Sequence, residues 1–508
     1  MKLRANTRRI SKTVSIPAPV GGLNARDSYA EMDAKDAVIM NNWFPLPMSV
    51  KVRKGYSIFA SGLLASVDSV MAYNAGSAQK LIAVAGTNFY DCTAGGAVGA
   101  AVTTCTNARW QHANFTTAGG SFLSCVNGVD APKLFDGTTW TNPAITGVTT
   151  TDLFAVTVHM QRLWYIQKNT MKVWYLPVGS IAGAATAFDL STMFKRGGYL
   201  AAMGSWTMDA GSGMDDHAVF ISSEGEIAIY RGVDPSSATT WGVVGVYYVG
   251  SPVGRRCVAQ YASDLLIISQ DGLMPMSRAL MSSRVNNAVS ITDKIQHLVS
   301  QDVTDYGANF GWQVRLFPKA NMLILNVPAG GGANRQYAMN TISGSWGRFT
   351  GWDAQSWEMY QDGIYFGDSN GNVCKAWDTN ADNGSNINSE VVQAFNYFGT
   401  QNLKHFKLSR PILNSSGSSL GIVAGMNFDF NFNEPVNTPT FSSTSSGKWG
   451  IGSKWGTAKW GASNAVRKDW QFSGGIGYCA GMHISTASSS ADIVWQSTTH
   501  IFEVGNGL

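Results

Sequence analysis

A strand–turn–strand unit recurs through the middle of the chain, and this repeat limits the possible folds more than any other feature. Each unit has a short apolar run, a turn, and a second apolar run. Three of the turns are Asn-Gly or Asp-Gly pairs, at Asn127-Gly128, Asp271-Gly272 and Asn370-Gly371. Both positions of such a turn must tolerate positive φ, so these pairs are strong hairpin signals. The seven first runs begin at Leu81, Phe122, Leu163, Val219, Leu265, Leu323 and Ile364.

The spacing of these runs, about 47 residues on average, lies between the repeat lengths of known propeller families. A single hairpin cannot bury its apolar face, whereas hairpins stacked radially around an axis can. The repeat therefore predicts an all-β fold, with a β-propeller of about seven blades over residues 65–385. The alternative is a set of unrelated hairpins in a β-sandwich.

Length and composition indicate two further regions. A chain of 508 residues exceeds the roughly 250–300 that one core can serve. We expect an N-terminal arm and lead-in segment over 1–64. After a linker at Asp382–Ser385, residues 386–508 alternate apolar with Ser, Asn and Thr, which predicts a β-sandwich-like domain. In that domain Lys-Trp-Gly occurs three times, at 448–450, 454–456 and 459–461, as a packed loop or a contact patch.

Two helices are expected between the strands. Asp33, with Asp36 three residues later, fits the start of a short helix that ends at Asn41. Ser290 and Asp293 fit a second helix start, and Ile295 and Val299 are spaced to share one face of that helix.

The charge pattern bears on partners. Only 14% of residues are charged, which suits a surface that neighbouring subunits cover. The net charge of +4 is small, but the N-terminus has basic residues and no acidic ones among them. This terminus is either a solvated arm or an arm that contacts an acidic partner or DNA phosphate. Its basic residues are Lys2, Arg4, Arg8, Arg9 and Lys12.

Targeting and redox signals are absent from the sequence as given. Residues 1–20 lack the apolar stretch of a signal peptide, and no run has the roughly 18 apolar residues of a membrane span. We therefore expect assembly in the cytoplasm. The six cysteines form no C-x-x-C pair and are expected to be buried free thiols.

No motif predicts catalysis. Most aspartates fall in turns, where they bond their own backbone, and the seven glutamates form no obvious facing pair. The seven histidines are widely separated, and no nucleophile elbow or phosphate loop occurs. The expectation is a protein that is not an enzyme, with no catalytic residue, cofactor or metal.

Two stretches resemble a known protein family. The first runs from Pro17-Ala18-Pro19-Val20-Gly21-Gly22-Leu23-Asn24 to Gly55-Tyr56, and the second covers Val219–Tyr230 and Gly250–Arg256 and extends to about residue 300. Both resemble the tail nozzle, or tail tubular protein B, group of short-tailed bacteriophages. The positions that carry the resemblance are Gly21, Gly22, Asn24, Asn42, Trp43, Pro45, Arg53, Gly55, Pro252, Arg255, Asp271 and Gly272.

The resemblance implies a structural virion protein with a β-propeller core. It further implies a homo-oligomeric ring of six copies that docks below the tail adaptor ring, supports tail fibres or spikes, and passes double-stranded DNA through its lumen during ejection. Its location would be the virion tail. Two alternatives stay open: a glycan-binding or glycan-cleaving propeller at a virion tip, and a soluble propeller that acts as an interaction scaffold.

Overall fold

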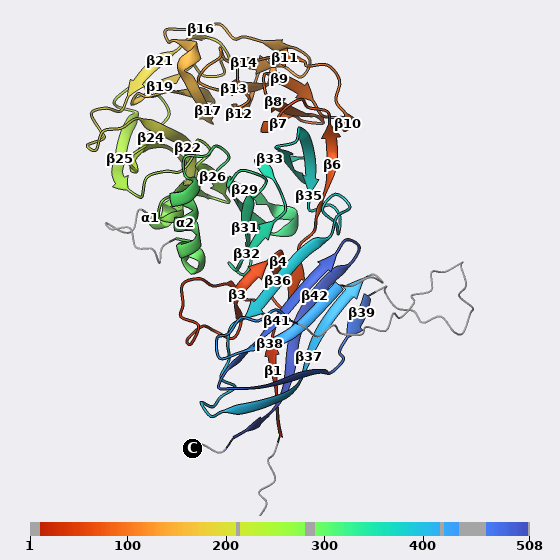
Figure 1. The fold of residues 1–508 in the computed structure, drawn as a ribbon. Helices are drawn as coiled ribbons and strands as arrows, with labels where there is room; N and C mark the ends of the chain where they lie inside the picture. The colour runs from red at the N-terminus through yellow and green to blue at the C-terminus, as the bar shows by residue number, and fades with distance from the viewer. Residues whose placement is uncertain (1–10, 210–213, 280–289, 417–420, 436–463, 506–508) are drawn as a thin grey trace, which may run out of the picture. The chain divides into compact units, whose positions relative to one another are not determined.

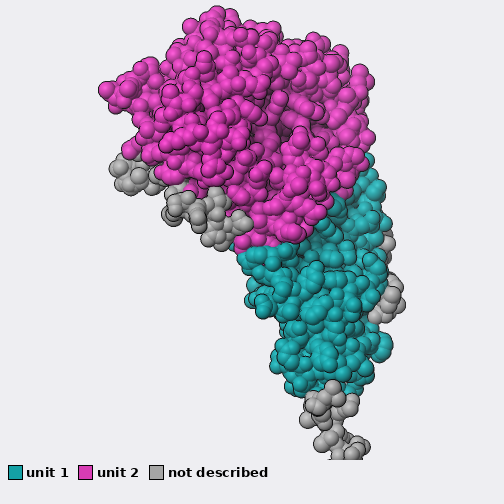
Figure 2. Space-filling view, turned by 60° about the vertical axis from the view of Figure 1, so that its left-hand side comes forward, with its two compact units in different colours: residues 1–57, 337–350, 377–508 teal, residues 58–336, 351–376 magenta. Residues whose placement is uncertain are grey.

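The computed structural model describes residues 11–209, 214–279, 290–416, 421–435 and 464–505. The chain divides into two compact units (Figure 2). The propeller unit contains residues 58–336 and 351–376, and the sandwich unit contains residues 1–57, 337–350 and 377–508. This division differs from the three consecutive domains that we expected, because the N-terminal segment belongs to the same unit as the C-terminal region.

The described strands of the propeller unit group into seven blades. Their arrangement can be followed in Figure 1. Blade 1 has β7 (Val67–Ala75), β8 (Ala78–Ala85), β9 (Asn88–Asp91) and β11 (Thr103–Thr104). Blade 2 has β12 (Gln111–Thr117), β13 (Gly120–Val126), β14 (Lys133–Phe135) and β15 (Trp140–Thr141). Blade 3 has β17 (Leu153–His159), β18 (Arg162–Gln167), β19 (Lys172–Tyr175) and β21 (Thr186–Asp189). Blade 4 has β22 (Leu200–Asp209), β23 (Met214–Ser222), β24 (Glu226–Gly232) and β25 (Trp241–Tyr248).

The remaining blades are less regular. Blade 5 has β26 (Val258–Tyr261), β27 (Asp264–Ser269) and β28 (Gly272–Pro275), followed by α1 (Met276–Ala279), η3 (Asp293–Ile295) and α2 (Gln296–Tyr306). Blade 6 has β29 (Gln313–Phe317), η4 (Pro318–Ala320), β30 (Met322–Val327) and the start of β31 (Arg335–Asn340). Blade 7 has β33 (Ala354–Tyr360), β34 (Gly363–Asp368), β35 (Asn372–Ala376), β6 (Tyr56–Ser61) and β10 (Gly96–Ala97). Between blades lie η1 (Thr150–Asp152) and the pair β16 (Ile145–Thr146) and β20 (Gly183–Ala184).

The first strands of successive blades contact one another around a closed circle. The contacts run through β7, β12, β17, β22, β26, β29 and β33, and β33 contacts β7 again. The ring is completed by β6, which precedes blade 1 in sequence but belongs to the sheet of blade 7. The predicted seven-bladed β-propeller is therefore confirmed.

The apolar runs found in the sequence are the second and third strands of each blade. Phe122–Val126, for example, lies in β13, and the apolar run that follows it, Leu134-Phe135, lies in β14. The innermost strands escaped detection because they are less uniformly apolar. In β12, six of seven residues are half-buried or exposed, since this strand faces the propeller axis.

Apolar clusters fill the space between neighbouring blades. One joins blades 1 and 2 through Phe89 and Trp110, whose rings are 5.1 Å apart. A second, around Leu163, joins blades 2 and 3. A third joins blades 3 and 4, where Trp164 stacks on Trp241 at 5.7 Å. Each blade therefore buries its faces against its neighbours, as stacked repeats require.

The sandwich unit contains two sheets. One has β4 (Trp43–Pro45), β5 (Val50–Val52), β42 (Asp492–Val504), β37 (Lys404–Ser416) and β39 (Asn464–Arg467), with β1 (Ser11–Pro17) on β42 and β40 (Gln471–Gly477) on β37. The other has β32 (Trp346–Thr350), β3 (Asp36–Asn41), β36 (Ile387–Gln393), β41 (Ala480–Ser488) and β38 (Gly421–Phe428), with β2 (Gly22–Leu23) on β3. Phe406 of β37 meets Phe428 of β38 with ring centroids 5.4 Å apart, so the two sheets share an apolar core. The predicted sandwich-like region is present, but strands from residues 11–52 complete it.

Three local predictions need correction. Residues 36–41 form strand β3 rather than a short helix, because they pair with β36 across the sheet. The second helix begins as η3 at Asp293 and continues as α2, a few residues later than expected. Asp382–Ser385 is a turn of the sandwich unit, with paired backbone, rather than a linker. The three Lys-Trp-Gly segments lie outside the described residues. In the described part of the chain no helix is long and apolar enough to cross a membrane.

Candidate functional site

The N-terminal positions that carry the family resemblance converge on one buried arginine in the sandwich unit. The Arg53 guanidinium donates two hydrogen bonds to the Asp382 carboxylate, at 2.8 and 2.6 Å. It also donates to Oδ1 of Asn42 at 2.8 Å and to the carbonyl of Thr350 at 2.6 Å. The Arg53 side chain has no exposed surface. This cluster, here the Arg53 cluster, joins the N-terminal segment around Asn42 and Arg53 to two distant segments, at Thr350 and Asp382.

Other residues of the same motif pack around these segments. Gly22 has φ of +80°, and a side chain there would collide with the backbone of Trp346. A side chain at Gly55 would overlap the carbonyl oxygen of Ala381. Asn24 donates to Asp36 at 2.7 Å, Trp43 is fully buried, and the carbonyl of Pro45 accepts from Asn340 at 2.9 Å. The neighbouring Gly21 donates its backbone N–H to Lys35 at 2.7 Å. The first motif therefore has a structural role in this unit.

The second motif lies in the propeller unit at blade 5. Asp271 lies in the turn between β27 and β28, and Gly272 is the first residue of β28, where a side chain would collide with Thr292 and Gln296. Pro252 and Arg255 lie in the segment before β26 and line a cavity. The two motifs are thus in different units, and the second one contributes to a cavity.

The basic N-terminal residues are mostly outside the described part of the chain. Lys2, Arg4, Arg8 and Arg9 fall there, and Lys12 is exposed in strand β1, where it pairs in register with Phe502. The described end of the expected arm is therefore an ordered strand of the sandwich unit.

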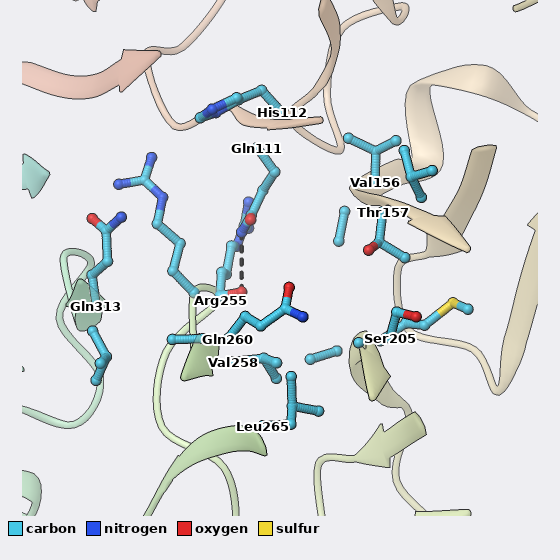
Figure 3. A pocket seen from close by; sticks show the side chains of 18 of the residues that line it. Gln111, His112, Val156, Thr157, Ser205, Arg255, Val258, Gln260, Leu265 and Gln313 are labelled. Atoms are coloured by element: carbon cyan, nitrogen blue, oxygen red, sulfur yellow. Dashed lines mark hydrogen bonds between the residues drawn. The ribbon is translucent and has the colours of Figure 1, made fainter. Parts of the chain in front are cut away.

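An axial cavity of about 420 Å³ lies among the inner strands of the propeller (Figure 3). Its lining mixes polar side chains, such as Gln111, His112 and Gln313, with apolar ones, such as Val156 and Val258. Arg256 and Arg315 also line this cavity.

In the axial cavity Arg315 and His112 share the carboxylate of Glu358, whereas Arg256 donates to the neutral oxygens of Ser69 and Trp110. Arg315 donates to Glu358 at 2.7 Å, and Nε2 of His112 lies 3.2 Å from the same carboxylate. Burial alone would raise the pKa of Glu358, but Arg315 and His112 outweigh it and hold the pKa at about 2. Burial, together with repulsion from Arg315, lowers the pKa of Arg256 to about 10. Glu358 is therefore a structural anion that balances its basic neighbours.

A second cavity, here the face cavity, has a volume of about 430 Å³. Its walls are the segments that lead into the inner strands of blades 2 to 6 and the turns between second and third strands. These two kinds of segment share a face of the propeller because adjacent strands run antiparallel. Arg109, Lys168 and Arg255 line the cavity together with the aromatic side chains of Phe154, Tyr199 and Phe310, and no acidic residue lines it.

The cations of the face cavity are only partly neutralised. Nζ of Lys168 lies 3.1 Å from Asp152, and Arg109 lies 3.6 Å from Asp68, in pairs that solvent reaches. The Arg255 guanidinium donates to a carbonyl, that of Asn127, at 3.2 Å. Burial and repulsion from Arg109 lower the pKa of Arg255, but the group stays charged at neutral pH.

A histidine and a serine lie within hydrogen-bond distance at the axial cavity. Nδ1 of His159 lies 2.9 Å from Oγ of Ser205, a side chain of the axial cavity. Burial lowers the pKa of His159 to about 4, and in the described residues its Nε2 has no hydrogen-bond partner. A Ser–His pair needs a third group to orient the imidazole, so this pair is not a catalytic triad. The described residues contain no group of three His, Cys, Asp or Glu side chains that could hold a metal.

Most residues of the face cavity were not predicted from the sequence. Arg255 was identified as a motif residue, without the cations that lie near it in the fold. Arg109, Tyr199 and Phe310 precede inner strands that were not detected. The signal that could have identified the cavity is topological. In a propeller, the turn between the second and third strands of a blade lies on the same face as the segment that leads into the next blade.

Comparisons with known proteins give little beyond distant structural likenesses. No family model matches the chain, and no curated protein matches it. The computationally designed Ika8 protein has a TM-score of 0.35 and 9% identity, over 63% of this chain and 99% of its own. The WD40 β-propeller domain of Doa1 has a TM-score of 0.40 and 12% identity, over 63% and 96%. BBS1N in complex with ARL6DN has a TM-score of 0.40 and 9% identity, over 62% and 94%.

Proposed function

We propose that this chain is a structural subunit of a short-tailed bacteriophage's tail nozzle. In this role about six copies form a ring at the end of the tail, below the adaptor ring. The ring conducts double-stranded DNA during ejection and supports tail fibres or spikes. The chain has no catalytic part in that role.

The observation that carries the proposal is the placement of the residues on which the family resemblance rests. Asn42, Trp43, Arg53 and Gly55 are all buried at the Arg53 cluster or beside it. A chance likeness in sequence would have no reason to fall on residues that hold distant segments together. The resemblance therefore covers the positions that matter for folding, which supports a common architecture.

An exposed edge strand supports a subunit role. β25 is the last strand in the order of its sheet, and its eight residues include no charged side chain. Val243, Val244, Val246 and Tyr248 are exposed by 41–52%. Proteins usually protect such an edge with charge or proline, since unpaired strands add to other chains. A neighbouring subunit in a ring would cover it.

The weak overall charge is compatible with DNA passage. Each phosphate that a protein neutralises strengthens binding, so a conduit should neutralise few. A net charge of +4 over 508 residues meets that condition.

The alternative of a glycan-cleaving propeller gains no support from the axial cavity. Glycoside hydrolysis needs a carboxylic acid with a raised pKa next to a second carboxylate. The buried carboxylate here, Glu358, has its pKa lowered to about 2 by Arg315 and His112. It would therefore be ionised at neutral pH and unable to donate a proton.

Quantitative mass spectrometry of density-purified phage particles tests the proposal, with a capsid protein as the reference. About six copies per particle are expected for a closed sixfold ring. Absence from particles, with presence in the cell lysate, would overturn the proposal and favour the soluble scaffold.

A further inference from the structure

We infer that the face cavity of the propeller binds an aromatic organic phosphate of about nucleotide size. The inference does not depend on the nozzle role, because it rests on the lining of one cavity in one unit.

Charge is the first argument. Three cationic side chains, Arg109, Lys168 and Arg255, line the face cavity without an acidic lining residue. Lys168 and Arg109 lie near Asp152 and Asp68, which are outside the lining, whereas Arg255 has no carboxylate partner among the described residues and is repelled by Arg109. An anion in the cavity relieves that repulsion. Arginine forks match the oxygens of a phosphate group in paired hydrogen bonds.

Arg255 is the residue best placed to bind the phosphate. Its guanidinium is held by one hydrogen bond, to the carbonyl of Asn127, and by the ring of Phe154, whose centroid is 5.8 Å away. A carbonyl does not neutralise the guanidinium charge, so the charge and the remaining N–H donors of Arg255 are available to an anion. Asn127 is the first residue after β13, in the loop that leads to β14. The carbonyl of this predicted turn residue thus orients the Arg255 guanidinium.

The aromatic side chains are the second argument. Phe154, Tyr199 and Phe310 line the same cavity, and Tyr199 is 44% exposed. The guanidinium carbons of Arg109 and Arg256 lie 5.0 and 4.9 Å from the Phe310 ring centroid, which keeps that ring in place. Aromatic faces beside phosphate-binding cations are the combination that recognises bases and their phosphates together.

Size is the third argument. A volume of about 430 Å³ exceeds the space that one phosphate needs and lies within the range of pockets for small organic ligands. The polar side chains of Asn169, Ser223 and Asn309 also line the cavity and supply hydrogen-bonding groups for the rest of the ligand.

The test uses the full-length protein and calorimetric titration with adenosine monophosphate. Inorganic phosphate and adenosine, which represent the two halves of the ligand, are titrated separately. Sodium chloride at matched ionic strength measures the nonspecific effect of salt. We expect adenosine monophosphate to bind more tightly than either half. A short single-stranded oligonucleotide, used as a fourth probe, shows whether the phosphate comes from a free molecule or from a nucleic-acid strand.

Three variants locate the site. Arg255→Gln should weaken adenosine monophosphate binding about tenfold through loss of a charge-assisted contact. Tyr199→Ala should weaken adenosine monophosphate but leave inorganic phosphate unchanged. Arg278→Gln, which removes the same charge from an exposed position of α1 outside the cavity lining, is the control and should change nothing.

Both Arg255 and Tyr199 are exposed enough that the variants should fold, and circular dichroism checks this. If Arg255→Gln weakens binding of the oligonucleotide as well as of adenosine monophosphate, the same site also accepts a phosphate of a nucleic-acid strand. No binding of adenosine monophosphate beyond the salt response would overturn the inference. Binding that is equal in Arg255→Gln and Arg278→Gln would also overturn it.

Discussion

The two units of this protein are held together in different ways. In the propeller unit, apolar clusters lie between neighbouring blades, and those between blades 1 and 2, 2 and 3, and 3 and 4 join segments that follow one another in the sequence. The cluster between blades 7 and 1 instead joins residues 60–98 to residues 360–373. In the sandwich unit, single polar residues connect segments hundreds of positions apart. Arg53 reaches Thr350 and Asp382, and the side-chain amide of Asn42 donates to the carbonyl of Asn388.

This difference concerns how stability is distributed. A propeller spreads its apolar contacts over many similar interfaces, so a defect in one has a limited, local effect. A buried charge with several partners concentrates its effect, because removal of one group leaves the others buried and unpaired. The following substitutions test this contrast.

Arg53→Met should have the largest effect. It leaves the Asp382 carboxylate without its partner and removes donors to Asn42 and Thr350, at an expected cost of about 3–5 kcal/mol. Chemical denaturation measures the loss, and hydrogen exchange should place it in the sandwich unit. Arg26→Met is the matched control, because the exposed Arg26–Asp27 pair contributes less than about 1 kcal/mol. Equal effects of the two substitutions would contradict a central role for Arg53.

Leu163→Ala tests the propeller unit. Leu163 is fully buried in the cluster between blades 2 and 3, and its truncation should cost about 3 kcal/mol. Hydrogen exchange should increase in blades 2 and 3 and much less in the sandwich unit. If protection were lost evenly across the whole chain, the two units would not be energetically separate.

A pH experiment compares one histidine in each unit. Burial lowers the pKa of His159 in the propeller unit and of His500 in the sandwich unit to about 4, from an ordinary value of 6.5. The unfolded chain therefore binds more protons between these values, and each histidine should destabilise its unit as pH falls from about 6.5 to 4. At pH 5 the loss should be about 2 kcal/mol for each group.

Substitution separates the two contributions. His159→Phe should reduce the acid sensitivity of the propeller unit alone, and His500→Phe that of the sandwich unit alone, as followed by hydrogen exchange at pH 7 and pH 5. Unchanged acid sensitivity in both variants would show that other groups control it.

Val244→Lys should have the smallest effect on folding. Val244 is 52% exposed on the edge strand β25, so the free energy of unfolding should change by less than about 0.5 kcal/mol. Assembly should nevertheless be impaired, because a lysine on the edge blocks addition of another strand. Native mass spectrometry measures the oligomer, and Val129→Lys, at a 50% exposed position in a loop, is the control. An oligomer that tolerates Val244→Lys would exclude β25 from the interface.

The propeller could be predicted and much of its detail could not. The second and third strands of a blade are apolar on both faces because blades cover both, so Leu81–Ala85 and Leu323–Val327 stand out in the sequence. Inner strands such as β12 and β26 are half-buried and carry polar residues toward the axis, so their pattern resembles that of a loop. The strand at Asp36–Asn41 was mistaken for a helix because local capping signals say nothing about a partner strand as distant as β36.

The sequence by itself determined the fold class, the seven repeats and many of their turns, because hairpin signals and apolar runs act between residues close in the chain. Only the tertiary structure showed that residues 11–52 complete the C-terminal sandwich, that Asp382 is the partner of Arg53, and that Arg109, Lys168 and Arg255 line one cavity. These contacts join positions separated by tens to hundreds of residues. No local sequence pattern encodes such a contact, because neither partner has a distinctive sequence environment. The contact exists only after folding has placed the two residues side by side.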